Sequence, residues 1–318
     1  MIQLFKIRTF SDYFSDTISF FKTSGRHFFR NYFIVNGGFM LVLIVLIYFG
    51  VTFYFESLQS ETTISMNAGV TTYDDWTSRN IPLFIGFIII SFLVIVVLSL
   101  LNVAYPIIYL SLYDKHQGHD FSTTQIINVL KNNILRLIKF SLGTIFIYMP
   151  LFFIILGVCL ALCFIIIGIP ILLIVFPTLY SWLSIAFYDY LTNQSRFFQA
   201  MQVGYRTVFQ DFWAVIGASF LMMMIVQMLQ TVVAMIPYII GVVIVFSSAQ
   251  DTDTVPQHEK FGFFVILMVI VFALSVTVGY ISNNLLVVAQ GLMYYSGRER
   301  QESVGTTNLI DKIGSDFE

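Results

Sequence analysis

Five stretches of the chain contain no charged residue: residues 31–55, 80–113, 140–188, 212–250 and 261–297. A bilayer core about 30 Å thick is crossed by about 20 helical residues, so each stretch is long enough to span a membrane. Only 11% of all residues are charged, against about 25% in a typical soluble domain. A soluble protein of this size could not cover its surface with so few charges. The sequence therefore predicts an integral membrane protein.

The number of spans follows from the lengths of these stretches. The third stretch is long enough for two helices, and Gly168 and Pro170 mark the predicted turn between them. The other four stretches hold one span each. We therefore expect an all-α, polytopic membrane helical bundle with six transmembrane helices, at about residues 33–55, 82–112, 140–163, 169–188, 212–235 and 262–294.

The distribution of Lys and Arg predicts the orientation of the chain. All but Arg79 and Lys260 of the 16 Lys and Arg residues fall in segments that six spans would place on one side of the membrane. Positively charged segments remain in the cytoplasm. We therefore expect both the N-terminus and the C-terminus in the cytoplasm.

Three segments that precede the first, third and fifth spans carry apolar residues three and four positions apart. This spacing predicts amphipathic helices that lie flat in the cytoplasmic interface, each turning into its span. The apolar stripes are Phe14, Ile18, Phe21, Gly25, Phe28 and Tyr32, then Ile127, Leu130, Ile134 and Leu137, then Phe198, Met201, Tyr205, Val208 and Phe212. Ser122 and Gln125 have the spacing of a capping box at the start of the second helix. We expect contacts with lipid phosphates from Lys22, Arg26, Arg30, Lys131, Arg136, Lys139, Arg196 and Arg206.

These similarities predict a threefold repeat within one membrane domain, residues 1–297, with units at about 8–113, 121–190 and 195–297. A polar cytoplasmic tail, residues 298–318, follows. Pro106 and Pro177 occupy similar places in the first two units, whereas the third unit lacks that proline. The alternative is that interfacial helices recur independently, as they do in many membrane proteins.

Two sequence segments support a family resemblance. FSDYFSDTISFF (10–21) and RNYF (30–33) run into the first span, and AMQVGYRTVFQDFW (200–213) runs into the fifth. This pattern resembles the bacterial six-span families around the glycerophosphoryl diester phosphodiesterase membrane domain and its uncharacterised relatives. The resemblance implies a multi-pass module of the bacterial inner membrane. In the named family a soluble phosphodiesterase domain follows the membrane part; here only the tail follows, so we do not expect that activity.

The predicted spans contain no ionisable residue, which argues against proton-coupled transport and against aspartyl or zinc-dependent intramembrane proteolysis. Their polar groups are amides and hydroxyls, for which hydrogen bonding between helices is the simpler interpretation. The alternative is a polar cavity for a substrate headgroup, lined by Asn102, Gln227, Gln230, Asn283, Asn284 and Gln290.

No metal or cofactor site is expected from the remaining residues. His116 and His119, next to Asp120, have a spacing that suits a metal on a turn, but no further cluster of ligands appears in the sequence, and a short polar loop is the simpler explanation. Cys159 and Cys163 share one helix face and are expected to be small core residues. The net charge of −2 gives no basic field for a nucleic-acid partner.

Two functions fit these observations. The first is a non-enzymatic module that organises the membrane or docks partners, with membrane lipids and other membrane or cytoplasmic proteins as its partners. The alternative is a transporter or channel for a lipid or a small apolar solute, which requires a continuous polar-lined cavity with Asn283 or Asn284 on its wall.

Overall fold

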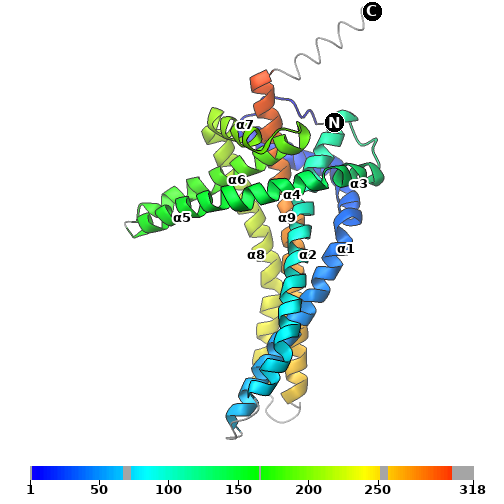
Figure 1. Cartoon of the computed structure of the whole chain (residues 1–318), viewed down its shortest axis with the longest axis vertical. Helices are drawn as coiled ribbons and strands as arrows, with labels where there is room; N and C mark the ends of the chain where they lie inside the picture. The colour runs from blue at the N-terminus through cyan, green and yellow to red at the C-terminus, as the bar shows by residue number, and fades with distance from the viewer. Residues whose placement is uncertain (1, 67–72, 165, 251–256, 303–318) are drawn as a thin grey trace, which may run out of the picture. The chain divides into compact units, whose positions relative to one another are not determined.

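The computed structural model describes residues 2–66, 73–164, 166–250 and 257–302, and these residues contain helices but no strands (Figure 1). This confirms the predicted all-α class. The helices are α1 (Phe10–Met66), α2 (Tyr73–Lys115), α3 (Thr123–Asn132), α4 (Ile134–Gly143), α5 (Met149–Cys163), α6 (Gly168–Thr192), α7 (Phe197–Gln210), α8 (Phe212–Gln250) and α9 (Gln257–Glu302), with a π-helical turn at Thr144–Tyr148 between α4 and α5.

Six helical stretches are long and apolar enough to cross a membrane. They are Phe10–Phe53, Ile81–Lys115, Ile134–Cys163, Gly168–Thr192, Phe212–Ile236 and Val265–Glu302. Their number equals the number of predicted spans, and each overlaps one of the five charge-free segments, the third of which supplies two stretches. The chain is therefore a multi-pass membrane protein.

The helix boundaries differ from the prediction at three places. α1 continues without a break from the predicted interfacial segment into the first span, because residues 10–66 contain no proline to interrupt the helix. Residues 56–66 and 73–80, which lie between the first two predicted spans, extend α1 and α2. α8 continues past Pro237 to Gln250, beyond the predicted end of the fifth span at about residue 235.

The second interfacial segment is divided at Asn133, which separates α3 from α4. α3 begins at the predicted capping box: the Ser122 hydroxyl accepts a hydrogen bond from the Gln125 N–H, and the Gln125 side chain accepts one from the Ser122 N–H. The third segment ends as predicted, because Asp211 interrupts the helix between α7 and α8.

The chain divides into two compact units. The first, here called the interface unit, contains Met1–Val35, Asn102–Gln227 and Asn283–Glu318, and therefore all of α3 to α7. The second, here called the bundle unit, contains Asn36–Leu101 and Met228–Ser282. The four long helices α1, α2, α8 and α9 contribute to both units, so the unit boundaries fall inside helices. The threefold repeat stays a prediction.

Aromatic side chains hold α1 and α2 together in the interface unit. Tyr105 and Tyr109, one turn apart on α2, are fully buried, as is Phe28 on α1. The Phe28 ring contacts both tyrosine rings, with centroids 5.1 and 4.8 Å away, and the Tyr105 hydroxyl donates a hydrogen bond to the Phe28 carbonyl at 2.6 Å. The predicted lipid-facing stripe of the first segment is therefore partly an internal packing surface.

Helices α6, α7 and α9 approach one another closely in the same unit. A Cβ atom at Gly204 of α7 would lie 2.6 Å from the Trp182 carbonyl oxygen of α6. The Trp182 indole donates a hydrogen bond to the Met201 carbonyl at 2.7 Å, and the Tyr188 hydroxyl donates one to the Val287 carbonyl of α9 at 2.8 Å. These contacts hold α6 against both α7 and α9.

The α5–α6 hairpin presents apolar side chains outward. Only Cys159 of α5 is buried, and Phe164 in the turn is 94% exposed. Gly168 lets the turn close, because a Cβ there would lie 2.4 Å from the Cys159 carbonyl oxygen. The two cysteines are not joined in a disulfide. An exposed apolar surface of this kind is expected for a hairpin that spans a membrane, because lipid tails cover it.

The bundle unit is held by a few polar pairs and by aromatic packing. Phe53 of α1 stacks on Phe84 of α2 with centroids 5.1 Å apart. The Ser99 and Tyr280 hydroxyls are 3.2 Å apart, and they join α2 to α9. Few of its described side chains are buried, as expected for helices that meet lipid on most of their surface.

Candidate functional site

Two of the amides predicted to line a cavity make hydrogen bonds to side chains of neighbouring helices. Asn102 accepts a hydrogen bond from the Tyr32 hydroxyl of α1 at 2.6 Å. The Gln290 amide donates to the Ser219 hydroxyl of α8 at 2.9 Å, and that hydroxyl lies 2.7 Å from the Ser181 hydroxyl of α6. All five of these side chains are buried inside the interface unit.

The remaining cavity candidates are distributed over both units. Gln230 belongs to the bundle unit, where its amide donates to the Ser282 hydroxyl at 3.4 Å. In the interface unit Asn284 is buried, Asn283 is partly buried and Gln227 is exposed. The polar cavity lined by these amides stays a prediction.

A small cavity of about 10 Å³, with both polar and apolar lining residues, occurs elsewhere in the interface unit and has room for about one water molecule. It lies between the starts of α1 and α8 and the ends of α7 and α9. Its wall includes Tyr13, Thr207, Asp211, Ser296 and Arg300. None of the amides predicted from the sequence lines it.

Seven of the eight cations predicted to contact lipid phosphates are exposed. They make no ion pair with any residue that the structure describes. They are Lys22, Arg26 and Arg30 on α1, Lys131 on α3, Lys139 on α4, Arg196 before α7 and Arg206 on α7. Three carboxylates of this unit pair with other cations: Asp16 with Arg8, Asp211 with Arg300 at 3.0 Å, and Glu302 with Arg298. The unit therefore offers positive charge that its own acids do not neutralise.

Arg136 is the exception among the predicted cations. Its guanidinium donates hydrogen bonds to the carbonyls of Tyr190 at 2.7 Å and Ser195 at 3.0 Å, and lies 4.4 Å from the centre of the Tyr190 ring. Arg136 thus ties α4 to the α6–α7 connection. The sequence cannot reveal this role, because carbonyl partners carry no sequence signal.

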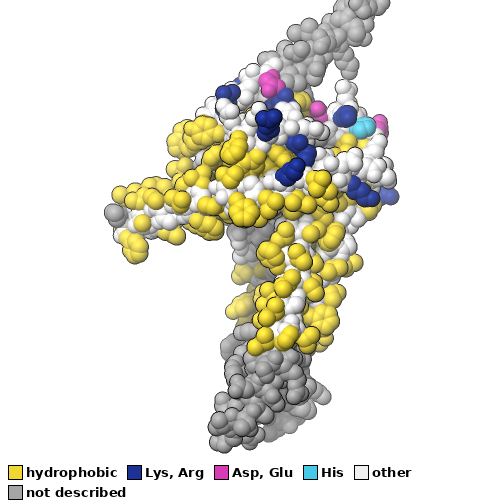
Figure 2. All heavy atoms as spheres, in the orientation of Figure 1, with side chains coloured by type: hydrophobic (Ala, Val, Ile, Leu, Met, Phe, Trp, Pro, Cys, Tyr) yellow, Lys and Arg dark blue, Asp and Glu magenta, His cyan; other side chains and the backbone are white. Residues whose placement is uncertain are grey.

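Large apolar side chains lie beside the exposed cations on α7 and α4. Phe198 on α7 and Trp213 at the start of α8 are 69% and 73% exposed, and Tyr205 and Phe209 on α7 are also exposed. These residues flank Arg206. On α4 the exposed residues Ile134, Leu135, Ile138 and Leu142 flank Lys139. Figure 2 shows Lys and Arg side chains next to hydrophobic ones on the part of the molecule that contains these helices.

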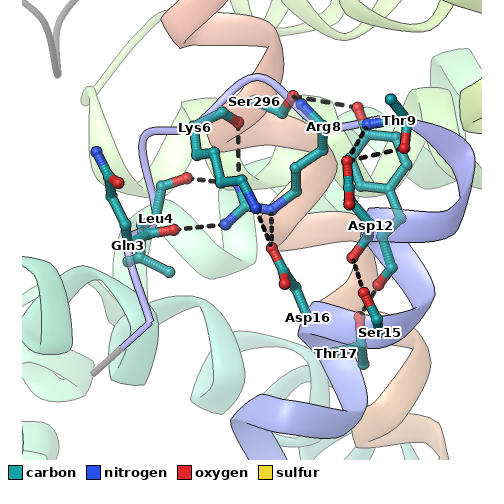
Figure 3. A network of polar contacts seen from close by, with 11 residues as sticks. Gln3, Leu4, Lys6, Arg8, Thr9, Asp12, Ser15, Asp16, Thr17 and Ser296 are labelled. Carbon is teal, nitrogen blue, oxygen red and sulfur yellow. Dashed lines mark hydrogen bonds and ion pairs between the residues drawn. The ribbon is translucent and has the colours of Figure 1, made fainter.

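A buried arginine near the N-terminus was not among the residues predicted from the sequence. The Arg8 side chain is fully buried and its guanidinium makes four hydrogen bonds, to the carbonyls of Gln3, Leu4 and Lys6 and to the Asp16 carboxylate (Figure 3). Burial lowers the pKa of Arg8, while the hydrogen bond to Asp16 acts in the opposite direction. An arginine remains charged under such conditions. Arg8 therefore organises the segment that precedes α1.

A buried carboxylate at the end of α6 was also missed, because Asp189 lies just beyond the charge-free stretch. Asp189 Oδ1 accepts hydrogen bonds from the Asn193 amide at 2.9 Å and the Tyr294 hydroxyl at 3.4 Å. Arg298 donates to Asn193 Oδ1 at 2.9 Å. The cluster joins the ends of α6 and α9. No group of three or more metal-ligating side chains occurs in the part of the chain that the structure describes.

Comparison with known proteins gives no relative for this chain. No protein-family model matches the sequence, and neither a curated protein nor a solved structure matches it.

Proposed function

We propose that the protein is a non-enzymatic module of a bacterial inner membrane that binds anionic lipid headgroups at the cytoplasmic face and thereby organises the bilayer or docks partners there. The observation that carries this proposal is the pairing of exposed, unneutralised cations with exposed apolar side chains on α4 and α7. Both termini lie in the cytoplasm in this proposal, because the Lys and Arg bias favours that orientation.

The α7 surface suits the boundary between headgroups and lipid tails. Aromatic side chains such as those of Tyr205 and Trp213 are favoured at the headgroup level, where their polar and apolar parts both find partners. Arg196 and Arg206 would then lie beside lipid phosphates. Each cation close to an anionic membrane surface contributes about 1 kcal/mol to binding.

The transporter hypothesis gains no support from the described cavity, because none of the predicted amides lines it. Asn102, Gln230 and Gln290 instead make hydrogen bonds with neighbouring residues. Those bonds favour a packed, structural role for the amides.

Lipid binding to the full-length protein tests the proposal. Delipidated protein in detergent is titrated with phosphatidylglycerol or phosphatidylcholine, and bound lipids are measured by native mass spectrometry. We expect selective retention of phosphatidylglycerol, and we expect the double variant Arg196→Gln, Arg206→Gln to lose part of it. The matched control is Lys6→Gln, because Lys6 already pairs with Asp16 at 3.6 Å. Equal retention of both lipids by the unmodified protein would contradict the proposal.

A further inference from the structure

A threonine hydroxyl near the end of α7 is buried without a hydrogen-bond partner. The Thr207 side chain is only 3% exposed, and its Oγ1 atom makes no hydrogen bond with any residue that the structure describes. A buried hydroxyl in this state costs free energy, because it has given up its hydrogen bonds with bulk water. Thr207 lies on the wall of the cavity between α1, α7, α8 and α9, and the cavity gives this hydroxyl room for a partner.

A second hydroxyl on the same wall has an unused hydrogen. Ser296 Oγ of α9 accepts hydrogen bonds from the Arg8 backbone N–H at 3.0 Å and from the Tyr13 hydroxyl at 3.2 Å. A serine hydroxyl also has one hydrogen to donate, and none of the described residues accepts it. Because Ser296 is 1% exposed, bulk water does not supply the acceptor. Two buried hydroxyls on one cavity wall therefore each lack a partner.

The two hydroxyls belong to helices that approach each other closely beside the cavity. A Cβ atom at Gly297, the residue after Ser296, would lie 3.0 Å from Thr207 Oγ1. The Thr207 and Ser296 hydroxyls themselves make no direct hydrogen bond. A ligand that joins them must therefore be small, and it must be able both to donate and to accept hydrogen bonds.

The size and the lining of the cavity suit a single water molecule. Its volume of about 10 Å³ is enough for roughly one water, and a buried water makes about 2–4 hydrogen bonds. Thr207 and Ser296 supply two polar partners, and the Asp211 carboxylate on the same wall is an acceptor for a hydrogen of the water. The side chains of Asp211 and Arg300, which form an ion pair on this wall, are each 32% exposed, so this side of the cavity borders solvent.

We propose that this cavity binds one ordered water molecule, which joins the Thr207 hydroxyl of α7 to the Ser296 hydroxyl of α9. The water accepts the Ser296 hydrogen and makes a second hydrogen bond with Thr207. Bonds through a water are enthalpically nearly as favourable as direct ones. Because Ser296 also binds Arg8 and Tyr13, the water adds α7 to the junction where the segment before α1 meets α9. The site is separate from the proposed lipid binding, since it depends only on buried contacts inside the interface unit.

A crystal structure of the full-length protein that resolves ordered waters tests this site directly. We expect a density peak in the cavity within about 2.7–3.2 Å of both Thr207 Oγ1 and Ser296 Oγ. A structure without such a peak would overturn the proposal. So would a structure in which the Thr207 hydroxyl donates to a protein carbonyl instead of to a water.

Replacing Thr207 with Val supplies a second measurement, whose sign depends on the water. Val has nearly the shape of Thr but lacks the hydroxyl, so the water loses one partner, and we expect the midpoint of thermal unfolding in detergent to fall by a few degrees. In a dry cavity the substitution would remove an unpaired buried hydroxyl, and the midpoint would stay the same or rise. Either of those two results contradicts the proposal. Thr23→Val on α1 is the matched control and should leave the midpoint unchanged, because Thr23 is exposed and its hydroxyl bonds to its own helix at the Ser19 carbonyl.

Discussion

The backbone N–H of Arg8 donates a hydrogen bond to the Ser296 hydroxyl at 3.0 Å, although the two residues are 288 positions apart. The Tyr13 hydroxyl donates to the same Ser296 oxygen at 3.2 Å, and the Phe5 and Tyr295 rings meet edge to face with centroids 5.1 Å apart. The segment before α1 is therefore fastened to the end of α9 within the interface unit. The conformation of this segment depends on the buried Arg8 side chain, whose guanidinium donates hydrogen bonds to three of the segment's carbonyls.

Replacing Arg8 with Met should destabilise the protein strongly. The change leaves the Gln3 and Leu4 carbonyls and the Asp16 carboxylate without their buried donor, which costs about 3–5 kcal/mol when one partner of a buried pair is removed. Lys6→Met is the matched control: Lys6 shares Asp16 but is 47% exposed, so its loss should cost about 0–1 kcal/mol. Thermal unfolding in detergent compares the two variants. Equal melting temperatures would show that the Arg8 bonds contribute little.

Replacing Gly204 with Ala should separate α6 from α7. The new Cβ would lie 2.6 Å from the Trp182 carbonyl oxygen and 3.0 Å from the Ala186 nitrogen, and these backbone atoms cannot move aside without shifting a helix. We expect a loss of about 1–3 kcal/mol, the usual cost of overpacking. Gly38→Ala in α1 is the control, because nothing lies within 4 Å of its Cβ position, and Ala favours a helix there by about 1 kcal/mol. A Gly204→Ala protein as stable as the unmodified protein would contradict the close approach of α7 to the α6 backbone.

The spans could be predicted because the bilayer imposes a length and a composition that any sequence shows. The packing partners could not. Phe28 and Tyr32 repeat at helical spacing, but periodicity does not distinguish a surface that faces lipid from one that faces Tyr105, since lipid tails and protein cores are equally apolar. Only the structure shows that Tyr105 and Tyr109 cover this stripe.

For the charged residues, too, the sequence does not show which side chains face inward. Cations such as Arg136 and Arg206 look equivalent in the sequence, yet Arg136 turns inward to two carbonyls while Arg206 remains exposed. Carbonyl partners exist at every residue, so no sequence pattern marks those that a guanidinium reaches. The proximity of the His27 and His119 rings, whose centroids are 5.3 Å apart, was hidden for a related reason, because it results from the packing of α1 against α2.

Asn102 and Tyr32 should show a measurable coupling across α1 and α2. Their hydrogen bond at 2.6 Å is buried, and such bonds between membrane helices contribute about 0.6 kcal/mol on average and up to about 1.7 kcal/mol. A double-mutant cycle of Asn102→Leu and Tyr32→Phe, followed by denaturant titration in mixed micelles, measures this energy. Strictly additive effects of the two substitutions would indicate that the amide has another role, such as lining a cavity.

The predicted orientation places residue 74 outside the cytoplasm and residue 131 in the cytoplasm, because the second span lies between them in the sequence. Cys159 and Cys163 are the only cysteines, so replacing both with Ala gives a cysteine-free background. In intact cells, a membrane-impermeant maleimide should label Asp74→Cys but should label Lys131→Cys only after the membrane is opened. Labelling of both positions from the same compartment would contradict the orientation that the distribution of Lys and Arg predicts. It would also place the exposed cations of α4 and α7 away from the anionic cytoplasmic leaflet, where the proposed lipid binding requires them.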